Sequence, residues 1–336
     1  MIKDPKENVG GTKIGILSNH ISLDGNNLGI SCDGDICIFD SDTGKMKKII
    51  RGDSFSQYGI LGFENIILQD DTIFAEVLFD MSNPSYVCPT GIAMIDFDSG
   101  NLLKIFKDDQ LSGVYGEYNS EGRSFFSENN ACSESYVRYG DFKVFEDYLL
   151  VGAPATWNIN TQHPDYRGMD VIQKSKIFLY NTVTGNLIHI FEDLDSEIYP
   201  IPIVRDTYAV TVDERDIFTG LGDQVAINEN FIVLSNPIEY EYYNRIGEIV
   251  IYDTNTKSHL FTIPNPSEIE NKATYAEAKI AISGKNIFVS DPFNSKVHQI
   301  NGDTGQLVRT YDSPNNQEGF GYEIASSNNL LLISQQ

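Results

Sequence analysis

The 336-residue sequence contains little cysteine, little positive charge and no long apolar run. Its four cysteines are too few for a disulfide-stapled scaffold, and none has the CxxC spacing of a zinc site. No stretch reaches the roughly 18 consecutive apolar residues of a membrane span. Lys and Arg total 24 against 48 Asp and Glu. The resulting net charge of -24 repels phosphate backbones, so we expect no nucleic-acid partner. The lack of a long apolar run predicts no membrane span.

Two interpretations of the cysteines remain open. All four, Cys32, Cys37, Cys88 and Cys132, can be small buried side chains. Alternatively, Cys32 and Cys37 flank Asp33-Gly34-Asp35 and face each other across a turn, which would allow a disulfide.

Two short patterns alternate along the chain. The first is an apolar run, a short polar turn and a second apolar run, and it predicts a β-hairpin. It occurs six times, at residues 20–31, 65–77, 142–154, 224–237, 279–292 and 322–334. The second pattern is also a hairpin and follows the first five copies, at residues 35–49, 91–106, 176–191, 248–263 and 296–311.

The turn of the second pattern has a fixed chemistry. It reads Asp or Asn, two residues, Thr or Ser, then Gly. This order is typical of a type I turn followed by a left-handed residue, where the Asp or Asn side chain accepts the following amides and Gly takes a positive φ. Lys257 replaces Gly in the fourth copy, so we expect that turn to be the most strained.

Two hairpins per repeat give four antiparallel strands, and no helical period is present. The sequence therefore predicts an all-β fold, a β-propeller of four-stranded antiparallel blades in a single domain, residues 1–336. Six repeats can be counted, the last incomplete, so six or seven blades are expected. The repeats cover residues 14–58, 59–138, 139–220, 221–274, 275–318 and 319–336. The sequence stops after the second strand of the sixth blade, so we expect a neighbouring chain or a continuation of the polypeptide at that edge.

The four residues Val151-Gly152-Ala153-Pro154, preceded by Tyr139-Gly140, resemble the FG-GAP repeat of integrin-α-type propellers. Weaker versions are Leu221-Gly222 with LSNP, Phe320-Gly321 with LLIS and Tyr275-Ala276 with VSDP. The resemblance implies a propeller and, in many such repeats, a calcium loop between the first two strands. The corresponding turns here lack enough spaced carboxylates, so we expect no metal.

The extra length of the longer repeats falls in two of the four connections of each blade. These are the connection after strand four (residues 107–138, 192–220 and 264–274) and the one between strands two and three (residues 80–89, 155–174 and 238–246). Both leave a four-stranded blade on the same face, which predicts one loop-elaborated face. Two insertions read as extra hairpins, around residues 119–122 and 205–207.

The loop-elaborated face is the expected binding surface, because loops on a rigid scaffold usually carry binding. Its aromatic residues offer rigid contact area for a protein or glycan partner. Alternatively, they form small satellite cores under the loops. The candidates are Trp157, Tyr166, Tyr240, Tyr242, Tyr243, Tyr118 and Phe125.

Four carboxylates follow the FG-like positions and are expected near the channel mouth: Asp141, Asp223, Glu277 and Glu323. They could bind a cation or a polyhydroxylated ligand, or they could simply be solvated. No catalytic motif is present, and the five histidines fall in different repeats. Arg51-Gly52-Asp53 spells an adhesion tripeptide, but so short a match often arises by chance.

These observations predict a non-catalytic binding or structural propeller, without cofactor, catalytic residue or metal, that docks a protein or glycan. The N-terminal residues MIKDPKENVGG lack the apolar core of a secretory signal, so we expect a cytoplasmic protein or a component of a virion, appendage or other extracellular assembly. The alternative is a carbohydrate-active enzyme that uses paired carboxylates at the channel mouth.

Overall fold

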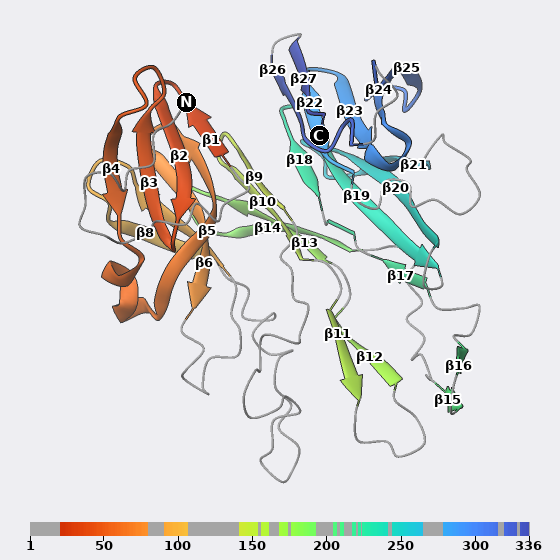
Figure 1. Ribbon diagram of the computed structural model, residues 1–336, viewed down its shortest axis with the longest axis horizontal. Coiled ribbons are helices and arrows are strands. Elements are labelled where there is room, and N and C mark those ends of the chain that lie inside the picture. Colours follow the sequence, from red (N-terminus) through yellow and green to blue (C-terminus); the bar gives the residue numbers. More distant parts are fainter. Residues whose placement is uncertain are drawn as a thin grey trace. The chain divides into compact units, whose positions relative to one another are not determined.

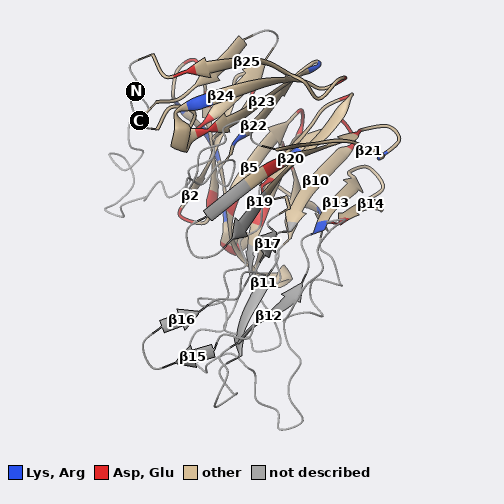
Figure 2. Ribbon diagram, turned by 90° about the vertical axis from the view of Figure 1, so that its right-hand side faces the viewer, with Lys and Arg blue, Asp and Glu red and all other residues tan. Residues whose placement is uncertain are grey.

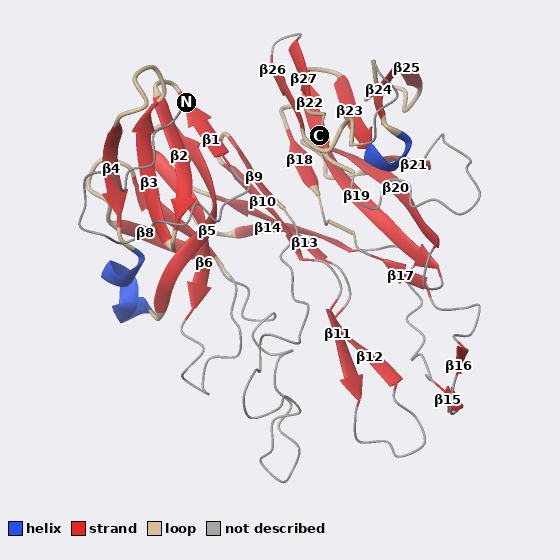
Figure 3. Cartoon of the chain, in the orientation of Figure 1, coloured by secondary structure: helices blue, strands red, loops and turns tan. Residues whose placement is uncertain are grey.

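The computed structural model describes residues 21–79, 91–106, 141–153, 156–160, 168–173, 176–192, 204–206, 209–211, 217–219, 221–222, 224–240, 244–264, 278–314, 319–327 and 330–335. The chain divides into two compact units, Met1–Glu134 and Ser135–Gln336. The boundary falls inside the predicted insertion at residues 107–138. Strands dominate the described part of both units (Figure 3).

The first unit contains two antiparallel sheets of four strands each (Figure 1). In both sheets the strands lie side by side in the order of the sequence. A 3-10 helix, η2 (Gly52–Tyr58), lies between the two sheets in the sequence. The strands are β1 (Ile21–Asp24), β2 (Asn27–Cys32), β3 (Asp35–Asp40) and β4 (Met46–Ile50), then β5 (Ile60–Gln69), β6 (Thr72–Phe79), β7 (Ile92–Asp96) and β8 (Leu102–Phe106).

The second unit repeats this arrangement with three larger sheets and a two-stranded sheet in the sixth repeat, and two further two-stranded sheets lie in its insertions. The first is β9 (Phe142–Phe145), β10 (Tyr148–Ala153), β13 (Lys176–Asn181) and β14 (Leu187–Glu192). The next contains β18 (Val225–Ile227), β19 (Phe231–Tyr240), β20 (Asn244–Asp253) and β21 (His259–Pro264). The third is β22 (Ile280–Ser283), β23 (Asn286–Asp291), β24 (Lys296–Asn301) and β25 (Leu307–Asp312), with the 3-10 helix η4 (Pro292–Asn294) between β23 and β24. The sheet of the sixth repeat is β26 (Ile324–Ser327) and β27 (Leu330–Ile333).

The hairpins predicted by both repeated patterns are present. Each copy of the first pattern forms a pair such as β1–β2 or β26–β27, and each copy of the second forms a pair such as β3–β4. The extra hairpin expected around residues 205–207 is present as β15 (Val204–Asp206) and β16 (Ala209–Thr211). Arg205 and Asp206, which were expected in its turn, lie in β15. The hairpin expected around residues 119–122 lies outside the described residues.

The turns between third and fourth strands have the expected chemistry. In the first sheet, Asp40 Oδ1 accepts the Thr43 backbone amide at 2.8 Å and the Thr43 hydroxyl at 2.7 Å. These two hydrogen bonds lower the pKa of Asp40 to about 2, and the bond from the hydroxyl has the larger effect. Equivalent bonds lower the pKa of Asp96, through Ser99. The residue after each of these turns has a positive φ: Gly44, Gly100, Gly185, Lys257 and Gly305.

Lys257 has a φ of 61°, which a side chain with a Cβ adopts only at a cost. Two contacts offset that cost. Its ammonium lies 4.7 Å from the centroid of the Tyr148 ring and donates a hydrogen bond to the carbonyl oxygen of Thr254. Desolvation lowers the pKa of Lys257. The expected strain is therefore present and is partly compensated by one contact with the preceding sheet and one within the turn itself.

Successive sheets within each unit bury apolar side chains against each other. In the first unit, Ile36 and Ile38 of β3 share a core with Ala93 and Ile95 of β7. In the second unit, β20 and β23 contribute to one core in the same way. Since a fully buried aliphatic side chain contributes roughly 1.5 to 3 kcal/mol, these clusters are the main source of cohesion between neighbouring sheets.

Glycines allow the closest approaches between successive sheets. A Cβ on Gly152, the glycine of the VGAP motif, would lie 2.9 Å from the carbonyl carbon of Gly222. In the first unit, a Cβ on Gly52 would lie 2.6 Å from the oxygen of Gly34 and 2.7 Å from Cα of Gly62. The motif glycine is therefore required because backbone packs directly on backbone.

Candidate functional site

The connections predicted to carry the binding surface contain regular β-structure. Strands β19 and β20 pair over their whole length, from Phe231 opposite Asp253 to Tyr240 opposite Asn244. The insertion at residues 238–246, expected to be a loop, is therefore largely an extension of two strands. The sequence predicted a loop here because of the polar residues, but the two strands remain paired through them.

A further strand, β17 (Ile217–Thr219), joins this extension. It belongs to the long connection before β18, and it pairs antiparallel with β19, with Ile217 opposite Tyr240 and Thr219 opposite Ile238. Hydrogen bonds thus join a connection after strand four to a connection between strands two and three. We call this three-stranded element, β17 with residues 236–240 and 244–248, the platform.

The insertion between β10 and β13 also folds as a hairpin, which the sequence patterns do not reveal. It consists of β11 (Thr156–Asn160) and β12 (Gly168–Gln173), with Trp157 opposite Val171. Of the aromatic candidates, Trp157 thus lies on β11 and Tyr240 on β19, in strands and not in loops. The other five candidates, Tyr118, Phe125, Tyr166, Tyr242 and Tyr243, lie outside the described residues.

Two of the four candidate carboxylates are described, and each is paired with a lysine. Asp141 Oδ2 lies 2.5 Å from Lys143 Nζ, and Glu323 Oε1 lies 3.6 Å from Lys279 Nζ. Asp223 and Glu277 lie outside the described residues. The described pair therefore does not present two unneutralised carboxylates.

Hydrogen bonds show which positions of the repeats are equivalent. Ser235 Oγ accepts the amide of Gln224, and Ser290 Oγ accepts the amide of Lys279. Ser334 Oγ accepts the amide of Glu323 in the same way. Each of these serines also donates its own amide to the backbone oxygen of the same partner, and Gly152 donates its amide to the oxygen of Asp141 in the same way. The equivalent positions in the repeats are therefore Asp141, Gln224, Lys279 and Glu323. Two members of this series are not acidic, so these positions do not form a ring of carboxylates.

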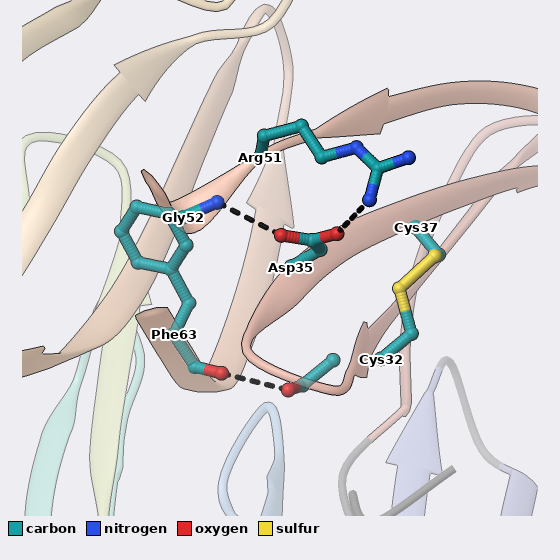
Figure 4. The surroundings of a disulfide bond; sticks show 7 residues. Cys32, Asp35, Cys37, Arg51, Gly52 and Phe63 are labelled. Carbon is teal, nitrogen blue, oxygen red and sulfur yellow. Dashed lines mark hydrogen bonds and ion pairs between the residues drawn. A yellow bond between two sulfur atoms is a disulfide. The ribbon is translucent and has the colours of Figure 1, made fainter. Parts of the chain in front are cut away.

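The adhesion-like tripeptide is held by structural contacts. Asp35 accepts hydrogen bonds from the Arg51 guanidinium at 2.9 Å and from the Gly52 amide at 2.9 Å (Figure 4). Gly52 is buried at the glycine contact described above. Figure 4 also shows the Cys32–Cys37 disulfide, which closes the β2–β3 turn beside this pair and confirms the second interpretation of those cysteines. The arginine is thus engaged within its own sheet.

One buried polar pair was not expected from the sequence. Asp291, at the end of β23, is fully buried and accepts hydrogen bonds from the amide and the side chain of Asn294. His298 Nε2 lies 3.8 Å from Asp291 Oδ2, and its ring is also buried. Their strand positions are not adjacent in sequence, so only the sheet register brings them together. Solvent has no access to this pair, and its role is structural.

Basic and acidic positions are interspersed along β24 and β25 (Figure 2), where Lys296 Nζ lies 2.6 Å from Asp312 Oδ1. In the part of the chain that the structure describes, no group of three or more His, Cys, Asp or Glu side chains is arranged to hold a metal ion. The same residues include no helix long and apolar enough to cross a membrane.

No protein-family model matches the chain, and no curated protein matches it. Several solved structures do. Hydrazine synthase from Kuenenia stuttgartiensis is 9% identical, with 94% of this chain and 83% of that chain covered and a TM-score of 0.51. Hsv2 from Kluyveromyces lactis is 10% identical over 92% and 69% of the two chains, with a TM-score of 0.45, and a europium-containing methanol dehydrogenase is 10% identical over 90% and 69%, with a TM-score of 0.40.

Hydrazine synthase is a β-propeller protein, and the larger sheets described here are antiparallel and built of four consecutive strands like propeller blades. The chain has a β-propeller fold. The blades follow one another along the sequence, as the repeats predicted. The predicted fold class is confirmed. The likeness extends to the fold alone, since enzymes and binding proteins both occur among the similar structures.

Proposed function

We propose that this propeller is a non-catalytic binding module of the FG-GAP, integrin-α-like type, which docks a protein or a glycan through the face that carries the platform. The pairing of β17 with β19 is the observation that supports this proposal most strongly. Because hydrogen bonds fix two separate connections in one ladder, the platform presents its residues without a large ordering cost on binding. Tyr240 lies in this ladder, and Tyr242 and Tyr243 follow it directly in the sequence.

The state of the carboxylates favours binding over catalysis. Glycoside hydrolysis needs two carboxyl groups roughly 5 to 10 Å apart, one of them able to donate a proton. Asp141 and Glu323 are instead each neutralised by a lysine. The described residues therefore support a binding role better than the alternative role of a carbohydrate-active enzyme.

The disulfide supports a location outside the reducing cytoplasm, because such bonds persist mainly in oxidising surroundings. Both Cys32 and Cys37 are buried, at 4% and 1% exposure. A component of a virion, an appendage or a cell surface fits this feature and the net charge of -24.

The test uses the full chain on a glycan array and in affinity capture from its native source. Replacing Tyr240, Tyr242 and Tyr243 together by Ala should weaken binding at least tenfold and leave the melting temperature nearly unchanged. The matched control is Val183→Ala. Val183 is exposed in the turn between β13 and β14, at the end of its blade opposite to the connection between strands two and three. Equal binding by both variants, or hydrolysis of a glycan by the wild-type chain, would contradict the proposal.

A further inference from the structure

A disulfide clamps the hairpin that β2 and β3 form in the first blade. Cys32 lies opposite Asp35, which closes the turn, and Cys37 lies two positions further along β3. Both cysteine side chains are buried in one apolar cluster. The turn between them, residues 33–34, has a positive φ at both positions, as tight two-residue hairpin turns do. The bond therefore holds the two ends of a tight turn together.

The opposite face of the same hairpin carries the second blade. Side chains alternate along a strand, so Ser31 and Ile36, next to the cysteines in the sequence, point to the other face. Ser31 Oγ donates a hydrogen bond of 2.8 Å to the carbonyl oxygen of Phe63 in β5, the first strand of the second blade. Ile36 belongs to the core that the two blades share. The disulfide and the junction between the blades therefore lie on opposite faces of one hairpin.

The clamped turn is itself in contact with the second blade. The carbonyl oxygen of Gly34 accepts the amide of Phe63 at 2.9 Å. A Cβ on Gly62 would lie 2.9 Å from Cα of Gly34, so the two backbones touch directly. Backbone atoms cannot adapt as the end of a long side chain can, so both contacts require the turn to stay in one place. The position of the turn therefore fixes the beginning of β5.

The same turn also holds the beginning of η2, which leads into β5. Asp35 accepts hydrogen bonds from the Gly52 amide and from the Arg51 guanidinium, each at 2.9 Å (Figure 4). Gly52 is buried, and a Cβ on it would lie 2.6 Å from the carbonyl oxygen of Gly34. Residues 51–63, from the end of the first blade to the beginning of β5, are therefore anchored at both ends to the clamped turn.

The fifth blade has a different pair at the place of the disulfide. The strand register makes Asp291 and His298 equivalent to Cys32 and Cys37. Asp291 and His298 form the buried polar pair described above, with Nε2 3.8 Å from Oδ2. In both blades, two side chains thus meet across the hairpin of strands two and three. Only the contact in the first blade contains sulfur, so only that contact responds to thiol reagents.

We propose that the Cys32–Cys37 disulfide is a redox-sensitive lock on the junction between the first two blades. When the bond is closed, it holds the turn that anchors η2 and β5. When the bond is reduced, the turn can move, and residues 51–63 open locally while both blades stay folded. The reductant is a dithiol: the protein S–S bond breaks, two S–H bonds form on the cysteines, and the dithiol gives up its two hydrogen atoms and closes to a cyclic disulfide. The lock does not depend on the platform or on what the platform binds.

Burial determines how the lock opens. A reducing thiolate must reach one of the two sulfurs, and Cys32 and Cys37 are only 4% and 1% exposed. Reduction therefore proceeds through a local opening of the hairpin. Once the bond is broken, the short loop between the cysteines is no longer constrained in the open state, so open states become more populated. The lock thus responds to sustained reducing conditions.

Hydrogen exchange of the full chain, with and without a dithiol, tests the lock. The amides of Gly52 and Phe63 are bonded to Asp35 and Gly34, at the clamped turn. Reduction should accelerate their exchange roughly tenfold or more beyond any acceleration at Val77, whose amide is bonded within the second blade. Reoxidation should restore the rates. Unchanged exchange at Gly52 and Phe63 would overturn the proposal, and so would equal acceleration at Val77, because the opening would then not be local.

Matched variants separate the bond from the packing of its side chains. Cys32→Ala with Cys37→Ala removes the lock, whereas Ile30→Val removes a single methyl group from the same apolar cluster and keeps the bond. Trypsin should cleave the bond after Arg51 roughly tenfold faster in the double variant than in the wild type, with little change in Ile30→Val. Equal cleavage of the double variant and the wild type would contradict the proposal. If the double variant does not fold, the exchange of the reduced wild-type chain decides alone.

Discussion

Replacing Gly152 by Ala tests the close backbone contact that the VGAP motif makes possible. The added Cβ would lie 2.9 Å from the carbonyl carbon of Gly222, and the carbonyl oxygen lies closer still. Both of these atoms belong to the backbone and not to a flexible side chain, so β10 and the backbone at Gly222 must move apart. Overpacking costs about 1 to 3 kcal/mol where side chains can yield, and we expect the upper end of that range, about 3 kcal/mol, for two rigid backbones. For a unit of this size, each kcal/mol lowers the melting temperature by roughly 2 to 4 °C, so the expected decrease is roughly 6 to 12 °C.

The measurement is urea and thermal unfolding of the full chain followed by circular dichroism, with Gly284→Ala as the control. Gly284 has a φ of 53°, and a Cβ added to it would meet no atom within 4 Å apart from its chain neighbours. That control therefore carries only the cost of a left-handed Ala, about 1 kcal/mol. Equal destabilisation by the two variants would show that the approach of Gly152 to Gly222 has no energetic weight, and the reasoning would be refuted.

Three further predictions concern the first unit. Asp70 has a φ of 51°, so Asp70→Gly should raise the free energy of unfolding by about 1 kcal/mol in urea titrations. The Asp40 carboxylate is held by Thr43, so its contribution to stability should be complete above about pH 4 and disappear as the pH falls toward 2, and Thr43→Ala should raise its pKa in an NMR titration. Replacing Cys32 and Cys37 together by Ser should cost about 2 kcal/mol, the entropy of a short closed loop, and a reductant should no longer change the unfolding curve.

The hairpins were predictable from the sequence because their determinants are local. A turn such as that of Asp40 needs only an acceptor, a hydroxyl residue and a glycine within five positions, and strand alternation flanks it. The lysine beside Asp141 could also have been anticipated, since Lys143 lies two residues along, on the same side of an extended segment.

The remaining features depend on residues far apart in the sequence. The pairing of β17 with β19 joins two insertions that carry no shared motif, and the Lys279 to Glu323 pair joins two blades. The contact of Gly34 with Gly62 likewise requires knowing which backbone segments approach each other. The VGAP motif alone does not show that Gly152 approaches Gly222.

The order of strands in the sheets has a consequence for biosynthesis. In each four-stranded blade of the first unit, every strand pairs with its immediate sequence neighbour, so a blade can form as soon as its own residues have left the ribosome. Cys32 and Cys37 belong to the first of these blades and precede Cys88 and Cys132 in the sequence. In an oxidising compartment their bond can close before any later cysteine emerges, so vectorial synthesis itself protects the chain against mispaired disulfides.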